Sequence, residues 1–150
     1  NYGSYDYSWY EKRMTKVVEH IKQCFPGVAV LIVSTADKST KYDLEMKTDS
    51  AVVPLAMAQK KYAVKSEAGF VNLYTLMGGD GSMVKWTEAV PPKANKDYTH
   101  FNYTGSKEIA KLIYDEIYSG YTLFKTLNKV FVEKKKKNDS VYTKIDSTNE

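Results

Sequence analysis

Asp97 and His100 are an acid and a base separated by two residues, a spacing that suits proton transfer. A carboxylate that holds one imidazole nitrogen fixes the tautomer of the ring and stabilises the imidazolium formed when the histidine accepts a proton. The pair therefore predicts a general base, His100, with Asp97 as its orienting partner. The same spacing also occurs by chance in many chains, so a surface loop without chemistry is the alternative.

The residues around this pair, 96–113, form a polar turn followed by an amphipathic run. This block resembles the last conserved block of the SGNH (GDSL-like) hydrolases, in which an Asp-x-x-His loop leads into a helix with an Ile-Ala core face. The resemblance extends upstream through 69–79, 30–34 and the predicted helix before 30–34, and it covers about residues 1–125. It implies that His100 is the general base, that Asp97 orients it, and that serine-dependent ester hydrolysis needs no cofactor.

The serine nucleophile of this family follows the first strand in a Gly-Asp-Ser motif, which does not occur in this sequence. Gly79–Ser82 reads Gly-Asp-Gly-Ser, but it comes much later in the chain, so Ser82 is not expected to be the nucleophile. The resemblance implies the C-terminal half of a hydrolase domain that is inactive without its N-terminal half. Asn1 stands where the family has its oxyanion asparagine, without the preceding glycine.

Resemblance to acetyl esterases with similar Asp-x-x-His surroundings implies an ester substrate, and O-acyl groups on carbohydrate or cell-wall glycan are the first choice. It also favours a secreted or periplasmic protein. Two alternatives are a non-catalytic module that binds glycan or protein through the aromatic segment 1–7, and an inactive half-domain with an open sheet edge. A binding module would tolerate the loss of His100, whereas a hydrolase would not.

Two apolar segments predict the strands that position this chemistry. Residues 28–33 are continuously apolar and β-branched, as expected of a parallel strand covered on both faces, and 69–74 predicts its partner. The expected fold is therefore a three-layer α/β/α arrangement with a parallel sheet. Because such sheets bind ligands at the carboxyl ends of their strands, Ser34, Asp37 and Ser39 are candidate substrate contacts. A turn and a cap are the alternative role for these residues.

Helices are predicted from apolar spacing and capping signals. The first helix is expected to begin at a capping box of Ser8 and Glu11 and to end near Gly27, and a second to start at Asp49–Ser50. A third is expected to start at Thr104 and end at Gly120, with a further short helix within 121–132.

The glycine-rich stretch 75–83 lacks the spacing of a phosphate-binding loop. It predicts a mobile loop or short helix beside the active site, in which Gly78 and Gly79 allow close approach of the backbone to substrate. Trp86, a little further on, either lines a cleft or fills the core.

The composition, 43% apolar and 27% charged over 150 residues, is that of one soluble domain. No apolar run approaches the roughly 20 residues that span a bilayer. The net charge of +4 owes much to Lys134–Lys137, within a polar segment, 133–150, that is expected to be a flexible tail. Neither nucleic-acid binding nor a metal site is expected, because basic residues are not interleaved with aromatics and His20 and His100 are far apart. The single cysteine, Cys24, is expected to be buried.

Overall fold

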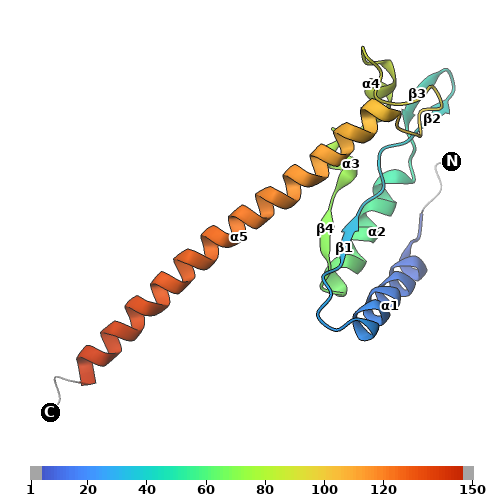
Figure 1. Cartoon of the computed structure of the whole chain (residues 1–150). Coiled ribbons are helices and arrows are strands. Elements are labelled where there is room, and N and C mark those ends of the chain that lie inside the picture. Colours follow the sequence, from blue (N-terminus) through green and yellow to red (C-terminus); the bar gives the residue numbers. More distant parts are fainter. Residues whose placement is uncertain (1–4, 147–150) are drawn as a thin grey trace. The chain divides into compact units, whose positions relative to one another are not determined.

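The computed structural model describes residues 5–146 and divides the chain into two compact units, Asn1–Ile113 and Tyr114–Glu150 (Figure 1). The helices and strands, in chain order, are α1 (Ser8–Cys24), β1 (Leu31–Val33), β2 (Ser39–Tyr42), β3 (Glu45–Thr48), α2 (Val52–Lys65), β4 (Gly69–Val71), α3 (Leu73–Leu76), α4 (Ser82–Glu88) and α5 (Tyr103–Asp146).

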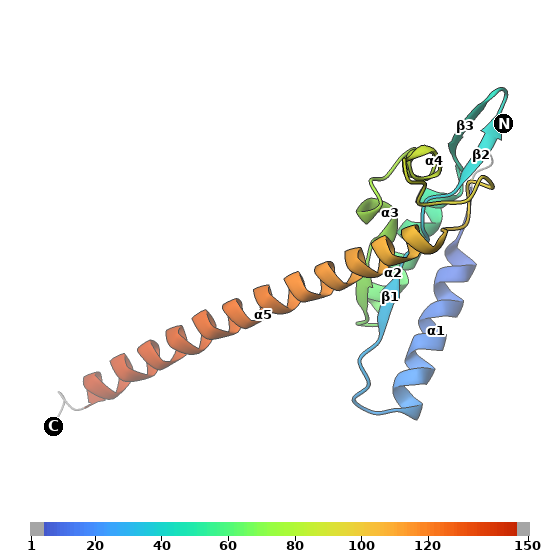
Figure 2. The same ribbon diagram turned by 45° about the horizontal axis from the view of Figure 1, so that its top comes forward.

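Strands β1 and β4 pair in parallel, with Ile32 opposite Phe70, and helix α2 packs against both strands. Helix α1 packs on α2, as the two views of the ribbon show (Figures 1 and 2). The prediction of an α/β fold with parallel strands and flanking helices is confirmed. The first predicted strand is shorter than 28–33, however, and it is not covered on both faces: Leu31 is 44% exposed in the two-stranded sheet of the described residues.

A hydrophobic core cluster of the first unit lies beyond the carboxyl ends of β1 and β4. Leu73, Met77, Met83, Trp86 and Ala94 form its buried centre. Side chains from the first turns of α5, such as Ile109, pack against this cluster. Trp86 therefore fills the core, which decides between its two predicted roles. Apolar burial of this kind stabilises the fold by about 25 cal/mol for each Å² removed from water.

An antiparallel hairpin of β2 and β3 occupies the segment that reads in sequence as a polar connection. Its tight turn contains Asp43, whose φ of 54° lies in the left-handed region that aspartate tolerates better than most residues. The sequence does not predict the hairpin, because its strands lack a clear alternation of apolar and polar residues. Its larger apolar side chains, Tyr42 and Met46, are only half-buried.

The helices begin close to the predicted positions, but the residues that cap them differ from the prediction in two of three cases. Helix α1 begins at Ser8 as predicted, but without the predicted capping box: the Asp6 carboxylate accepts the Ser8 N–H at 2.8 Å. Helix α2 follows Asp49, whose carboxylate accepts the Ala51 N–H at 2.9 Å. Helix α5 is capped by Asn102, which accepts the Gly105 N–H at 3.0 Å, and not by Thr104.

Helix α5 does not end at Gly120 but continues to Asp146, so the short helix expected within 121–132 is part of it. One glycine costs a helix only about 1 kcal/mol relative to alanine, so a single glycine does not have to end it. The backbone of 133–146 is likewise helical, and a domain boundary at 132 stays a prediction.

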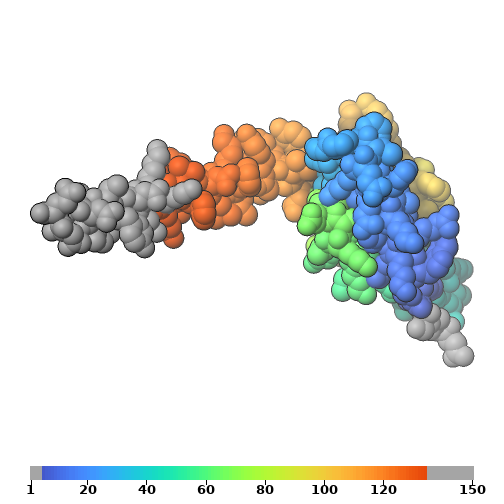
Figure 3. Space-filling view, turned by 90° about the horizontal axis from the view of Figure 1, so that it is seen from below, coloured from blue at the N-terminus to red at the C-terminus, as the bar shows by residue number. Residues whose placement is uncertain are grey.

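The surface of the first unit includes α1, whose outer face is visible in the space-filling view (Figure 3). Cys24 at its end is exposed, which corrects the prediction of a buried thiol, and its Sγ lies 3.7 Å from His20 Nε2. Within the described part of the chain, no helix is both long and apolar enough to cross a membrane.

Candidate active site

Asp97 and His100 meet in one surface turn. The Asp97 carboxylate accepts the backbone N–H groups of Thr99 and His100 through Oδ1, at 2.9 and 3.0 Å. Its other oxygen, Oδ2, lies 2.9 Å from His100 Nδ1. Because an ionised carboxylate only accepts hydrogen bonds, Nδ1 is the protonated nitrogen and Nε2 is left as the proton acceptor. This is the tautomer that a general base needs.

The hydrogen bonds of the turn also keep the Asp97 carboxyl ionised. The backbone N–H of His100, then the His100 side chain, then the backbone N–H of Thr99 lower the pKa of Asp97 to about 2. A hydrogen bond to the charged form of a carboxyl favours that form. The side chains of Asp97 and His100 are 49% and 74% exposed, so a substrate or another segment of protein can reach the imidazole.

Backbone hydrogen bonds attach this turn to its surroundings. Asn95 N–H donates to His100 O at 2.9 Å, and Tyr98 N–H donates to Asn95 O at 3.1 Å. Tyr98 itself has a φ of 54°, and its carbonyl accepts the N–H of Ser39 at 2.9 Å. The turn is thus held from within and from the first residue of β2.

The residues after His100 join the turn to the rigid part of the unit. The Phe101 ring packs on the core residue Trp86, with ring centroids 5.7 Å apart. Asn102 donates to Pro92 O at 2.7 Å in addition to capping α5. Gly105 lies so close to the Lys93 carbonyl that a Cβ atom would clash with it. These contacts give the polar residues and the glycine after the Asp-x-x-His pattern a structural role, because they attach the segment after His100 to the 86–93 region.

The three polar residues predicted as substrate contacts after β1 are buried, and two of them have internal partners. Ser34 Oγ donates to Asn72 Oδ1 at 3.3 Å, which connects the ends of β1 and β4. Asp37 Oδ2 accepts the Ser82 hydroxyl at 3.1 Å and the Met83 N–H at 2.7 Å. Ser39 is also buried, and its Oγ has no hydrogen-bond partner among the described residues. In this structure the three side chains are buried, and their contact with a substrate stays a prediction.

The glycine-rich stretch folds as two short helices around a turn. Gly78 and Gly79 have φ values of 114° and 73°, which residues other than glycine rarely adopt. Ser82 lies at the start of α4, only 1% exposed and bonded to Asp37, so its hydroxyl is not available to attack a substrate. Asn1 lies outside the described residues.

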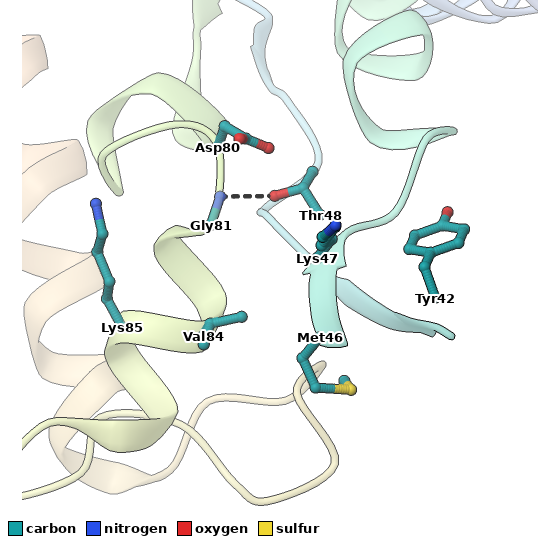
Figure 4. A pocket seen from close by; sticks show the side chains of 8 residues that line it. All are labelled: Tyr42, Met46, Lys47, Thr48, Asp80, Gly81, Val84 and Lys85. Carbon is teal, nitrogen blue, oxygen red and sulfur yellow. Dashed lines mark hydrogen bonds between the residues drawn. The ribbon is translucent and has the colours of Figure 1, made fainter. Parts of the chain in front are cut away.

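A pocket of about 480 Å³ lies between the β2–β3 hairpin and the start of α4 (Figure 4). Its lining combines apolar, aromatic, hydroxyl and charged side chains: Tyr42, Met46, Lys47, Thr48, Asp80, Gly81, Val84 and Lys85. The Gly81 N–H donates to Thr48 Oγ1 at 2.8 Å, which connects the two walls. Sequence reasoning missed this site because it depends on the hairpin.

The pocket and the Asp97–His100 turn share one strand pair. Thr48, in the pocket wall, lies directly opposite Ser39 in the register of the hairpin. Ser39 in turn donates its N–H to Tyr98, between Asp97 and His100. Opposite residues in an antiparallel pair have Cα atoms about 5 Å apart. Thr48, in the pocket wall, is therefore the direct cross-strand neighbour of Ser39, whose N–H group bonds the turn.

The aromatic residues near the start of the chain pack mostly on one another. The Tyr7 ring contacts Tyr10 edge-on at 6.1 Å, and Tyr10 contacts the buried Tyr62 at 5.8 Å. Tyr5 stacks on Tyr7 and its hydroxyl hydrogen-bonds with Ser50 at 3.1 Å. This packing explains their sequence pattern without a ligand.

Comparison with known proteins gives one informative likeness. No family model matches the sequence, and no curated protein matches it. Among solved structures, a peptidoglycan O-acetylesterase superposes on 78% of this chain with a TM-score of 0.69 and 20% sequence identity. The matched region is 33% of that esterase, so the chain spans about a third of its length. At this identity, the likeness shows a shared fold.

Proposed function

We propose that this chain supplies the general base, His100, and its orienting acid, Asp97, to the serine-dependent hydrolysis of an ester. One observation carries the proposal: the 2.9 Å contact between Asp97 Oδ2 and His100 Nδ1, on an exposed turn. The fold that holds this turn is shared with an esterase, which raises the prior for ester chemistry without assigning the residues.

The proton steps follow from the tautomer. A serine hydroxyl transfers its proton to His100 Nε2 as its oxygen attacks the acyl carbon, and Asp97 stabilises the imidazolium that forms. His100 then gives that proton to the departing alcohol, which leaves an acyl-enzyme. Water, deprotonated by the same nitrogen, attacks the acyl carbon and releases the acid and the free serine.

The nucleophile in this proposal comes from a segment outside these 150 residues, in keeping with the resemblance to SGNH hydrolases. Ser82 is buried against Asp37 and so does not compete for the role. The N-terminal segment of the same domain is then the partner that completes the site. That segment would also supply most of the oxyanion donors, and Asn1 would be the donor that this chain provides.

The substrate class is an O-acylated carbohydrate or cell-wall glycan, with the acyl group at His100 and a sugar in the pocket. Thr48, Asp80 and Lys85 line that pocket with groups that hydrogen-bond to sugar hydroxyls. Lys85→Ala in the complete protein should raise KM for an O-acetylated glycan several-fold while leaving the turnover of p-nitrophenyl acetate unchanged. Lys60→Ala, an exposed lysine on α2 away from the pocket lining, is the matched control.

The decisive experiment is His100→Ala in the complete protein, assayed with p-nitrophenyl acetate and with an O-acetylated glycan. Loss of the base in a serine hydrolase lowers kcat by about 10⁶-fold. Because His100 is exposed, the variant should melt at the wild-type temperature. His20→Ala removes the chain's other histidine and should keep full activity. Wild-type turnover in His100→Ala would remove the proposal.

Residues 1–150 made alone should hydrolyse neither substrate above a His100→Ala control, because triad members act as a unit. Adding the N-terminal segment of the domain should restore activity that depends on His100. Activity of the unmixed chain that disappears in His100→Ala would place the nucleophile within these 150 residues.

A further inference from the structure

The second unit, 114–150, exposes many large apolar side chains. Ten large apolar side chains on α5 are between 45% and 70% exposed. We refer to seven of them as the apolar face: Ile117, Tyr121, Leu123, Phe124, Leu127, Val130 and Phe131. Contiguous exposed apolar surface usually marks an interaction site.

The spacing of these residues puts them on one side of the helix. At 3.6 residues per turn these seven cover about half of its circumference, while one tyrosine and four polar residues fall on the other side: Tyr118, Ser119, Thr122, Thr126 and Lys129. A two-stranded coiled coil would cover only the narrow seam made by two positions in seven. The apolar face is therefore wider than one partner helix can bury.

The charges in the stretch that carries the apolar face, 117–137, are mostly positive. From Ile117 to Lys137 the sequence holds six lysines and one acidic residue, Glu133. Lys125 lies at the border of the apolar face, with its Nζ 5.4 Å from the centre of the Tyr121 ring. Lysines at such a border extend their charge outward while their methylene groups stay on apolar surface. A surface that is both apolar and anionic would complement this arrangement.

We propose that residues 117–137 bind, as an amphipathic helix, to the surface of a membrane that contains anionic lipid. The apolar face enters the boundary between headgroups and acyl chains, and the lysines contact lipid phosphates. The helix lies on the membrane and does not cross it, since no described helix is apolar enough to do so. The proposal is independent of ester hydrolysis, because the helix would attach a catalytic domain or a purely binding domain to the membrane equally well.

Co-sedimentation with vesicles tests this directly on the full 150-residue chain. It should pellet with vesicles of phosphatidylglycerol and phosphatidylcholine, and much less with phosphatidylcholine alone. Phe124→Gln with Leu127→Gln should lower the partition coefficient by about tenfold or more, because two large side chains no longer enter the acyl region. Lys125→Gln with Lys129→Gln should lower it by roughly fivefold per lysine, from about 1 kcal/mol each.

The matched control is Thr122→Gln with Thr126→Gln, which makes the same number of changes on the polar side of α5 and should bind as wild type. Circular dichroism shows whether each variant keeps its helix, and the lysine variants test the proposal even if the apolar ones do not fold. The proposal would be overturned if Thr122→Gln with Thr126→Gln lowered vesicle binding as much as Phe124→Gln with Leu127→Gln. So would a chain that forms dimers through the apolar face in solution and ignores anionic vesicles, which would make a second copy the occupant.

Discussion

Asp37 and Asp97 are two aspartates that each accept several hydrogen bonds, one in the interior and one on the surface. Asp37 is 1% exposed and bonds Ser82 and Met83, far away in the sequence. Asp97 has a side chain that is 49% exposed and bonds residues within three positions, including His100.

The difference assigns the two carboxylates opposite tasks. A buried carboxylate that joins distant segments holds the fold together, because removing it leaves its donors unsatisfied in the interior. An exposed carboxylate with a local partner contributes little to stability, since solvent screens it. What it can do is keep an imidazole in one tautomer where substrate reaches it. Variants of the two residues should therefore separate activity from stability.

Asp97→Ala should give the largest effect on activity within this comparison. In the complete protein, kcat for p-nitrophenyl acetate should fall by about 10⁴-fold, as is typical when the orienting acid of a serine hydrolase is lost. The melting temperature should fall only slightly, because the carboxylate is exposed. A large drop in melting temperature would show that Asp97, like Asp37, holds the fold together.

Asp37→Ala should mainly affect stability. It leaves the Ser82 hydroxyl and the Met83 N–H without their acceptor in the interior, which should lower the free energy of unfolding by about 2–4 kcal/mol. Urea unfolding followed by the fluorescence of the core residue Trp86, in a Trp9→Phe background, measures this. Wild-type stability combined with a lost enzymatic activity would instead support the predicted role of Asp37 as a substrate contact.

Ser82→Ala should have a smaller effect of the same kind. Asp37 loses one donor but keeps the Met83 N–H, so the free energy of unfolding should fall by about 1 kcal/mol. Esterase activity of the complete protein should remain near wild type. Covalent labelling of Ser82 by a fluorophosphonate probe would contradict its structural role.

The smallest effect concerns the titration of Asp97. Its pKa of about 2 lies below the ordinary value of 3.8, so the turn gains stability from the ionised carboxyl above pH 4 and loses it as the pH falls through 2. In His100→Ala the backbone N–H donors remain, so the pKa should rise and yet stay below 3.8. Carboxyl-carbon NMR on the 150-residue chain measures both values. A wild-type value near 4 would mean that the turn does not form in solution.

Local contacts explain what could be predicted from the sequence. Asp97 and His100 are three positions apart, so a single turn brings them together whatever the rest of the chain does. The apolar, β-branched run before Ser34 likewise predicts a strand from its own composition, and β1 pairs in parallel with β4 as expected. The start of α1 at Ser8 also follows from neighbouring residues, although Asp6 provides the cap.

Tertiary structure decided the features that depend on distant residues. The bond between Asp37 and Ser82 joins residues 45 positions apart, and no local pattern distinguishes the buried Asp37 from an exposed one. Trp86 is a core residue because Phe101 and the start of α5 pack on it. The pocket exists only because the β2–β3 hairpin and the start of α4 meet at Thr48 and Gly81. Spacing along the chain reports contacts within a turn or two, whereas burial is set by segments that fold back from far away.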